Sequence, residues 1–132
     1  NINPLSGVTV GRHDLIDSME ISTNEIETSN ELHKIITEVL IKCKSKGLKT
    51  GIGGKITHNS LTRLKEYIDK GILDKFETRK VVFPAATIDK AKEAINHALK
   101  FELLWLQSKK RYYSGISKLD DERILQLNAR LK

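Results

Sequence analysis

A repeated order of short strand, glycine and helix is the feature that most constrains how this chain can fold. Residues 7–10 form a β-branched run that ends at Gly11, and residues 48–52 form a second strand that runs into a glycine-rich loop. A third strand is expected at residues 75–83, because Pro84 cannot donate to a sheet ladder and would end it. Strands that alternate with helices predict an α/β fold with a parallel sheet covered on both faces.

Apolar residues recur at helical spacing between these strands. The first predicted helix begins near Thr28, which forms a capping box with Glu31, and ends at Gly47 in a left-handed cap. The second predicted helix has its apolar face at residues 61–68 and is closed by Gly71. The two helices therefore lie where crossover connections between parallel strands are expected.

The helix that follows the third strand, at residues 88–111, has more apolar surface than one side of a lone helix usually needs. A second partner surface, such as another subunit, is therefore expected for it. A short final helix is predicted at residues 120–131. We accordingly expect a domain of residues 1–113 followed by a helical tail of residues 114–132.

Three strand–helix units leave the edges of a parallel sheet open. The organisation therefore predicts partner strands, supplied by a longer chain or by a second polypeptide. The sequence also begins at Asn1 without an initiator methionine, which suits an engineered fragment, a processed product or an excerpt.

The charge and the cysteine content of the chain limit the partners and the cellular compartment that can be expected for it. Lysine and arginine number 23 against 17 acidic residues, a net charge of +6 that permits binding of nucleic acid or other anions. The one basic cluster with aromatics, residues 109–113, is interpreted as a solvated helix end, so a nucleic-acid partner is not expected.

The single cysteine, Cys43, excludes an internal disulfide and favours a reducing, cytoplasmic compartment. No apolar run approaches the ~20 residues of a membrane span.

The most specific motif is the stretch VTVGRHDLIDSM at residues 8–19. It resembles the motif after the sixth strand in the HpcH/HpaI aldolase and citrate lyase family: a hydrophobic strand, Gly, one residue, a small residue, Asp-Leu and soon a Met. Gly11, Asp14, Leu15 and Met19 match this pattern. The order of the following strands and helices is also similar to the family, as far as about Tyr113.

This resemblance implies the C-terminal part of a (β/α)8 TIM barrel, made of its last three βα units, the long C-terminal helix and the short final helix. It implies a metal-dependent carbon–carbon lyase that acts on a pyruvate-like 2-keto acid or a related acyl substrate, with Mg²⁺ or Mn²⁺ as the divalent cation. Breaking a carbon–carbon bond next to a 2-keto acid leaves an enolate, whose charge a hard cation stabilises. The C-terminal helix would dock on a neighbouring subunit, giving a homo-oligomer.

The resemblance also implies roles for individual residues. Asp14 would be a metal ligand, and the backbone amides around Gly11, Arg12 and His13 would hold the substrate carboxylate. The family's second metal ligand, a Glu, and its general base would lie upstream of Asn1, in the other part of the barrel. The fragment alone is therefore expected to be inactive.

This sequence departs from the family pattern at three positions. Arg12 and His13 stand where the family usually has small residues or proline, and Glu20 stands where it usually has glycine. Arg12 could contact a second carboxylate or a phosphate of the substrate, or it could form a surface salt bridge. His13 could crowd the pocket.

Two other functions stay open from the sequence. The chain could be a non-catalytic assembly or binding module derived from such a barrel, with the departures as signs of a decayed site. It could also be a basic module that binds anions or nucleic acid through residues 109–113. The glycine-rich loop at residues 51–55 could approach a phosphate, but a tight turn is the preferred interpretation.

Overall fold

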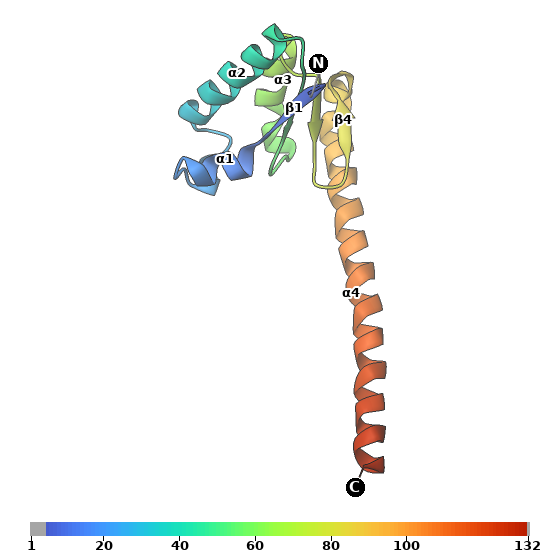
Figure 1. Ribbon diagram of the computed structural model, residues 1–132. Helices are drawn as coiled ribbons and strands as arrows, with labels where there is room; N and C mark the ends of the chain where they lie inside the picture. The colour runs from blue at the N-terminus through green and yellow to red at the C-terminus, as the bar shows by residue number, and fades with distance from the viewer. Residues whose placement is uncertain (1–4, 132) are drawn as a thin grey trace. The chain divides into compact units, whose positions relative to one another are not determined.

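The computed structural model describes residues 5–131, which form one four-stranded sheet, helices on it and a long helix at the end (Figure 1). The helices and strands, in chain order, are β1 (Gly7–Gly11), α1 (Arg12–Ser18), η1 (Thr23–Glu25), α2 (Asn30–Ser45), β2 (Lys49–Gly53), η2 (His58–Ser60), α3 (Leu61–Asp69), β3 (Lys75–Glu77), β4 (Val82–Pro84), η3 (Ala85–Lys90) and α4 (Ala91–Arg130).

The sheet has the order β1-β2-β3-β4. β1 pairs with β2 and β2 with β3 in parallel, whereas β3 and β4 are antiparallel. The strand–helix alternation predicted for the first two strands is therefore present, and the carboxyl ends of β1 and β2 lie at the same edge of the sheet.

The prediction of a partial TIM barrel with three βα units is wrong. A barrel sheet is parallel throughout, but here the expected strand at residues 75–83 is split into β3 and the antiparallel β4. The chain reverses between them because the Thr78 amide donates to the Val81 carbonyl over 2.9 Å. The charged residues Arg79 and Lys80 stay exposed at the tip of this turn. The sheet is consequently small, mixed and open.

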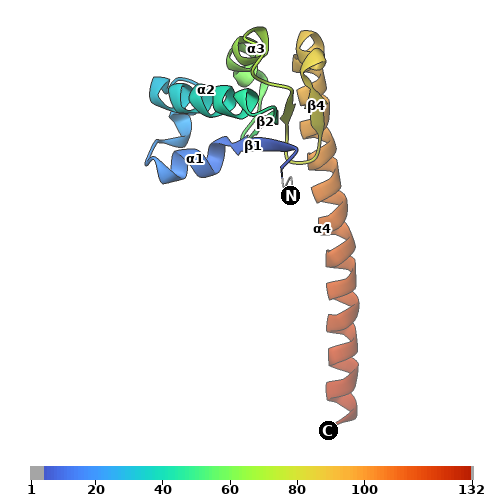
Figure 2. The ribbon, with the colours of Figure 1, turned by 45° about the horizontal axis from the view of Figure 1, so that its top comes forward.

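One face of the sheet forms the hydrophobic core. Val10, Ile52 and Phe76 are in register across β1, β2 and β3, and side chains at alternate positions of a strand share a face. Ile52 and Phe76 are buried and belong to the core cluster with residues of α2 and α3. Figure 2 shows α2 and α3 side by side over these strands.

The predicted helix ends are mostly confirmed. Gly47 and Gly71 both adopt positive φ, 71° and 69°, just after α2 and α3. The α2 cap differs by one residue from the prediction, because Ser29 rather than Thr28 accepts the hydrogen bond, from the Leu32 amide.

The predicted separate final helix is wrong, because α4 continues through Gly115 to Arg130 as one helix. The chain nevertheless divides into two compact units, the first extending to Leu99 and the second beginning at Lys100. The expected boundary after residue 113 stays a prediction. None of the helices within residues 5–131 is long and apolar enough to cross a membrane.

Candidate functional site

The face of the sheet opposite the core is polar and has glycine at its centre. Thr9, Gly51 and Lys75 are in register across three strands, and the next row contains Gly11 and Gly53. A Cβ atom on Gly51 would lie 2.7 Å from Thr9 Oγ1 and 2.9 Å from Lys75 Cε. Side chains from β1 and β3 thus fold over the glycines of β2, so that the polar groups border a backbone floor.

The same arrangement recurs at the carboxyl ends of the strands. A Cβ atom on Gly53 would lie 2.9 Å from Glu77 Cγ, and one on Gly11 would lie 3.5 Å from Asp14 Oδ2. Because Gly11 and Gly53 are register partners, the carboxylates of Asp14 and Glu77 flank two adjacent glycines. We call these four residues the glycine–carboxylate edge.

A shallow hollow of about 660 Å³ lies on this polar face, towards the amino ends of the strands. Thr9, Lys49 and Lys75 line it with Val82 and Pro84 of β4. Lys75 and Glu77 lie two residues apart in β3 and so project from the same face, about 6.6 Å apart along the strand. The face therefore presents a cation next to the two carboxylates.

The backbone beneath the edge is held by Arg12, whose side chain points into the protein. Arg12 is 3% exposed. Its Nε donates to the Gly54 carbonyl over 3.0 Å, and its Nη2 donates to the Lys55 carbonyl over 3.0 Å. Nη1 and Nη2 also donate to the two carboxylate oxygens of Glu27, at 3.0 and 3.1 Å. All three guanidinium nitrogens thus have acceptors within this chain.

Ser60 and Glu27 complete this buried network. Ser60 Oγ donates to Glu27 Oε1 over 2.6 Å and accepts from Arg12 Nη2. The network ties the β1–α1 turn to the loop before α2 and to the start of α3. The structure therefore gives the Arg12 side chain a role in holding these loops together, and its predicted substrate contact could come only from its backbone amide.

Gly54 fixes the loop after β2 against the start of α1. It has a φ of +87°, and a Cβ atom there would lie 2.7 Å from the His13 amide nitrogen and 2.8 Å from that of Arg12. Only glycine fits this close approach. The predicted tight turn over residues 51–55 is only partly present, because residues 51–53 belong to β2 and the chain bends at Gly54 and Lys55, which both have positive φ.

The other two predicted site residues lie at the surface. His13 and Asp14 are exposed in the first turn of α1. The His13 ring nitrogen Nδ1 lies 4.0 Å from Asp17 Oδ2, which is a weak ion pair at most. Among the predicted residues, then, Gly11 and Asp14 lie together at the glycine–carboxylate edge, while Arg12 is directed inward.

Sequence reasoning missed Glu77 and Gly53 as members of the site. The side chain of Glu77 lies across Gly53. The signal was present in the alternation of residues 75–77, which puts Lys75 and Glu77 on the face opposite Phe76. The alternation of Gly51 and Gly53 in β2 marks the same face.

The edge fits a hard divalent cation in ligand type but supplies few ligands. Carboxylate oxygens are the protein groups that Mg²⁺ and Mn²⁺ prefer. Within residues 5–131, however, no three histidine, cysteine or acidic side chains are grouped so as to hold a metal ion. Asp14 and Glu77 could therefore provide only part of a coordination sphere, with substrate oxygens or water providing the rest.

A second polar cluster, between α2 and α3, has a structural character. His33 Nδ1 lies 2.7 Å from the Tyr67 hydroxyl, and His33 Nε2 lies 3.5 Å from Glu66 Oε2. Burial, helped by the positive charge of Arg63, lowers the pKa of His33. Burial raises the pKa of Tyr67 to about 12. Both groups are neutral near pH 7, and their rings stack with centroids 5.2 Å apart.

A third cluster braces the amino end of β2. Lys44 Nζ lies 2.6 and 2.7 Å from the two oxygens of Asp74, and the Thr50 amide donates to Asp74 Oδ2 over 2.7 Å. Burial alone would raise the pKa of Asp74, but the hydrogen bonds from Lys44 and Thr50 outweigh it and lower the pKa. This carboxylate therefore stays ionised and structural.

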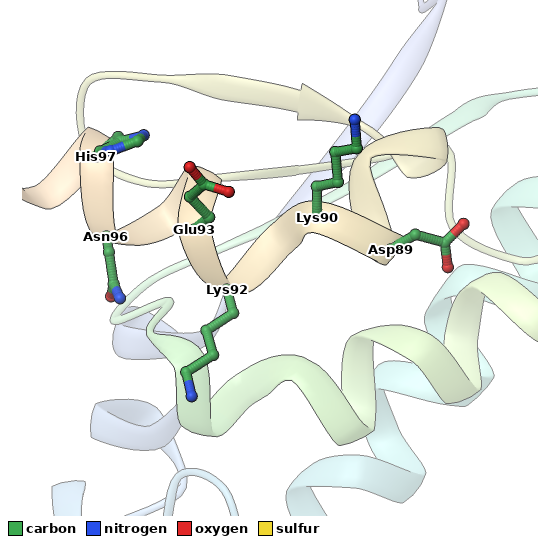
Figure 3. Close-up of a pocket in the computed structure, with 6 residues that line it drawn as sticks. All are labelled: Asp89, Lys90, Lys92, Glu93, Asn96 and His97. Carbon is green, nitrogen blue, oxygen red and sulfur yellow. The ribbon is translucent and has the colours of Figure 1, made fainter.

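A hollow of about 480 Å³ at the start of α4 carries no comparable arrangement. Figure 3 shows that its side chains fan out from one helical segment, with Lys92 and Asn96 on the side away from Glu93. They do not converge on a common point. We therefore place the candidate site on the sheet.

Comparison with known proteins does not extend this picture, since no family model, no curated protein and no solved structure matches the chain.

Proposed function

We propose that the glycine–carboxylate edge binds a divalent cation and the carboxylate end of a 2-keto acid, as part of a carbon–carbon lyase of the aldolase or citrate lyase type. The observation that carries the proposal is the placement of Asp14 and Glu77 over the paired glycines Gly11 and Gly53. The motif resemblance of residues 8–19 supports the reaction type. The proposal does not depend on a barrel.

Asp14 is the residue best suited to hold the cation. Its carboxylate is exposed at the end of β1 and forms no hydrogen bond or ion pair with another described residue, so all its lone pairs are available. Glu77 lies in β3, two strands from β1 along the same edge, as a second oxygen donor. A divalent cation bound there would stabilise the negative charge that develops on the keto oxygen when the carbon–carbon bond breaks.

The glycines and Lys75 suit the organic part of the substrate. The Glu77 side chain covers Gly53, whereas the only atom near the missing Cβ of Gly11 is Asp14 Oδ2 at 3.5 Å, so a flat carboxylate can approach the backbone at Gly11. Lys75 lies on the same face with its stem across Gly51 and can pair with a substrate carboxylate. Arg12 and Gly54 contribute by fixing the two loops, which keeps the edge rigid without touching the substrate.

The test is the binding of Mn²⁺ to the 132-residue chain, followed by electron paramagnetic resonance with and without pyruvate. We expect Mn²⁺ binding that pyruvate strengthens, and loss of this binding in Asp14→Asn. Asp17→Asn is the matched control, because it removes the same charge from the same helix at a side chain that is 66% exposed and points to His13. Equal Mn²⁺ affinity in wild type and Asp14→Asn would refute the assignment.

Lys75→Met separates the two parts of the site. This substitution keeps the aliphatic stem over Gly51 and removes the charge. We expect it to weaken the effect of pyruvate while leaving the affinity for Mn²⁺ alone unchanged. If pyruvate strengthens Mn²⁺ binding as much as in wild type, Lys75 has no part in substrate binding.

A non-catalytic assembly module is the second candidate. The observation in its favour is the number of exposed apolar side chains on α4 after Lys100, which include Leu103, Trp105 and Leu119 at 54%, 52% and 66% exposure. Self-association without any Mn²⁺ binding that depends on a 2-keto acid would favour this function over the lyase.

A further inference from the structure

The part of α4 after Lys100 carries an apolar seam that is open to solvent. Every described residue from Leu103 onward is exposed. In a helix, residues spaced alternately three and four positions apart lie on the same side and form a continuous line. Starting at Leu103, this line contains five large apolar side chains, namely Leu103, Leu106, Tyr113, Ile124 and Leu127.

Three polar residues interrupt the seam near its middle. They are Lys110, Ser117 and Asp120, and they occupy the remaining positions of the same line. A polar residue at a seam position weakens a helix pair unless the facing residue complements it, and so selects both orientation and register. The order of these three residues therefore reports how a partner helix would lie.

We propose that two copies of this chain pair antiparallel along the seam, with the two-fold axis at the level of Gly115. In this register, residues equally far before and after Gly115 face one another. Lys110 then lies opposite the partner's Asp120, and Tyr113 lies opposite the partner's Ser117. Each polar interruption thus meets either an opposite charge or a side chain of complementary size that can hydrogen-bond.

The apolar positions match in the same register. Leu103 faces the partner's Leu127, and Leu106 faces the partner's Ile124. The two-fold axis repeats each pair, so aliphatic layers close both ends of the seam around a polar centre. From Leu103 to Leu127 the contact would be roughly 36 Å long at a rise of about 1.5 Å per residue.

A parallel pair in register is disfavoured by the same residues. It would put Lys110 against the partner's Lys110 and Asp120 against the partner's Asp120. Like charges at facing seam positions oppose pairing. The antiparallel register converts both repulsions into attractions, which is the charge complementarity on which the proposal rests.

The residues beside the seam are consistent with this arrangement in two cases out of three. Ile116 would lie beside the partner's Ile116 near the axis, and Glu102 would lie near the partner's Arg130. Lys109 would lie near the partner's Arg123, which is a repulsive pair. Both of these cations are exposed at the rim, where salt screens their interaction strongly.

Disulfide cross-linking of the 132-residue chain tests orientation and register. The background is Cys43→Ser, because Cys43 is the chain's only cysteine. Leu103→Cys and Leu127→Cys chains are prepared separately, mixed and oxidised. We expect a disulfide between the two different chains and little cross-linking of either chain with itself. Self-linked Leu103→Cys dimers would show parallel pairing and overturn the proposal.

Charge exchange tests the polar layer. We expect Lys110→Asp and Asp120→Lys each to raise the dimer dissociation constant at least about tenfold, because each puts like charges face to face. The double variant should restore dimerisation. Lys118→Asp makes the same charge change outside the seam and should leave the dissociation constant near that of wild type. Single variants that dimerise as well as Lys118→Asp would refute the register.

Sedimentation equilibrium of the wild-type chain decides whether a second copy is the occupant at all. A concentration-dependent monomer–dimer equilibrium, with helix content unchanged by circular dichroism in the variants, supports the proposal. A chain that stays monomeric at high micromolar concentration overturns it. If that monomer also sediments with anionic phospholipid vesicles, the seam belongs to a lipid surface instead.

Discussion

Substituting Gly54 by alanine should test whether the edge of the sheet is as closely packed as the structure shows. Gly54 has a φ of +87°, and its new Cβ would lie 2.7 and 2.8 Å from the amide nitrogens of His13 and Arg12. Both contacts are with backbone, so no side chain can rotate out of the way. Either α1 or the loop after β2 must move.

The magnitude follows from a comparison with Gly71. Gly71 also has a positive φ, of +69°, but a Cβ atom there would meet nothing within 4 Å. Gly71→Ala should therefore cost only the left-handed conformation, about 1 kcal/mol. Gly54→Ala has the same conformational cost and adds a backbone clash of about 2 kcal/mol, as overpacking typically does. We expect it to lose about 3 kcal/mol in total.

The measurement is urea denaturation of the wild type and both variants, with the unfolding free energies obtained by linear extrapolation. Gly54→Ala should unfold at clearly lower urea than Gly71→Ala. If the two variants lose the same stability, the close approach between the loop and α1 does not exist in solution. That result would also refute the inference that the candidate site has a rigid edge.

The remaining predictions concern buried polar groups. Arg12→Met should lower the unfolding free energy by about 3 kcal/mol, measured by the same denaturation, because Glu27 is left without its main partner. The pKa of Asp74 is lower in the folded protein than in the unfolded chain, where it is about 3.9. Ionised Asp74 therefore stabilises the folded protein above that pH, and the free energy of unfolding should fall as the pH drops below it. Asp74→Asn should flatten this acid dependence in urea titrations at several pH values. Because the pKa of Tyr67 is raised to about 12, stability should fall above pH about 10, where unfolded tyrosine ionises. Tyr67→Phe should remove that part of the alkaline dependence.

The first two strands and their helices could be predicted because local signals agree with the tertiary structure. Residues 8–10 are β-branched and are followed by Gly11, and Gly47 and Gly71 occupy the left-handed positions expected of helix caps. The third strand was mispredicted because β-propensity does not reveal a reversal. The hydrogen bond between the Thr78 amide and the Val81 carbonyl that makes the turn is visible only in three dimensions.

The site was partly predictable for a similar reason. A motif in one segment could place Gly11 and Asp14 together at the end of β1. It could not show that Glu77, far along the chain, lies across Gly53 beside them. The motif also could not show that the Arg12 side chain points into the protein, because the acceptors of its guanidinium lie in Glu27 and in the loop after β2.

The proposed role of Asp14 as a cation ligand and the structural role of Arg12 can be distinguished experimentally, because the two side chains form different contacts. Asp14 forms no hydrogen bond or ion pair within the described residues, and its charge favours the first turn of α1 by only about 0.5 kcal/mol. Asp14→Asn should therefore leave the urea midpoint almost unchanged, so a loss of Mn²⁺ binding in this variant would reflect a lost ligand. Arg12→Met should lower the midpoint strongly and weaken Mn²⁺ binding only through the loops. A large loss of stability in Asp14→Asn would show that Asp14 is a structural residue, and would leave the proposed cation site without its main ligand.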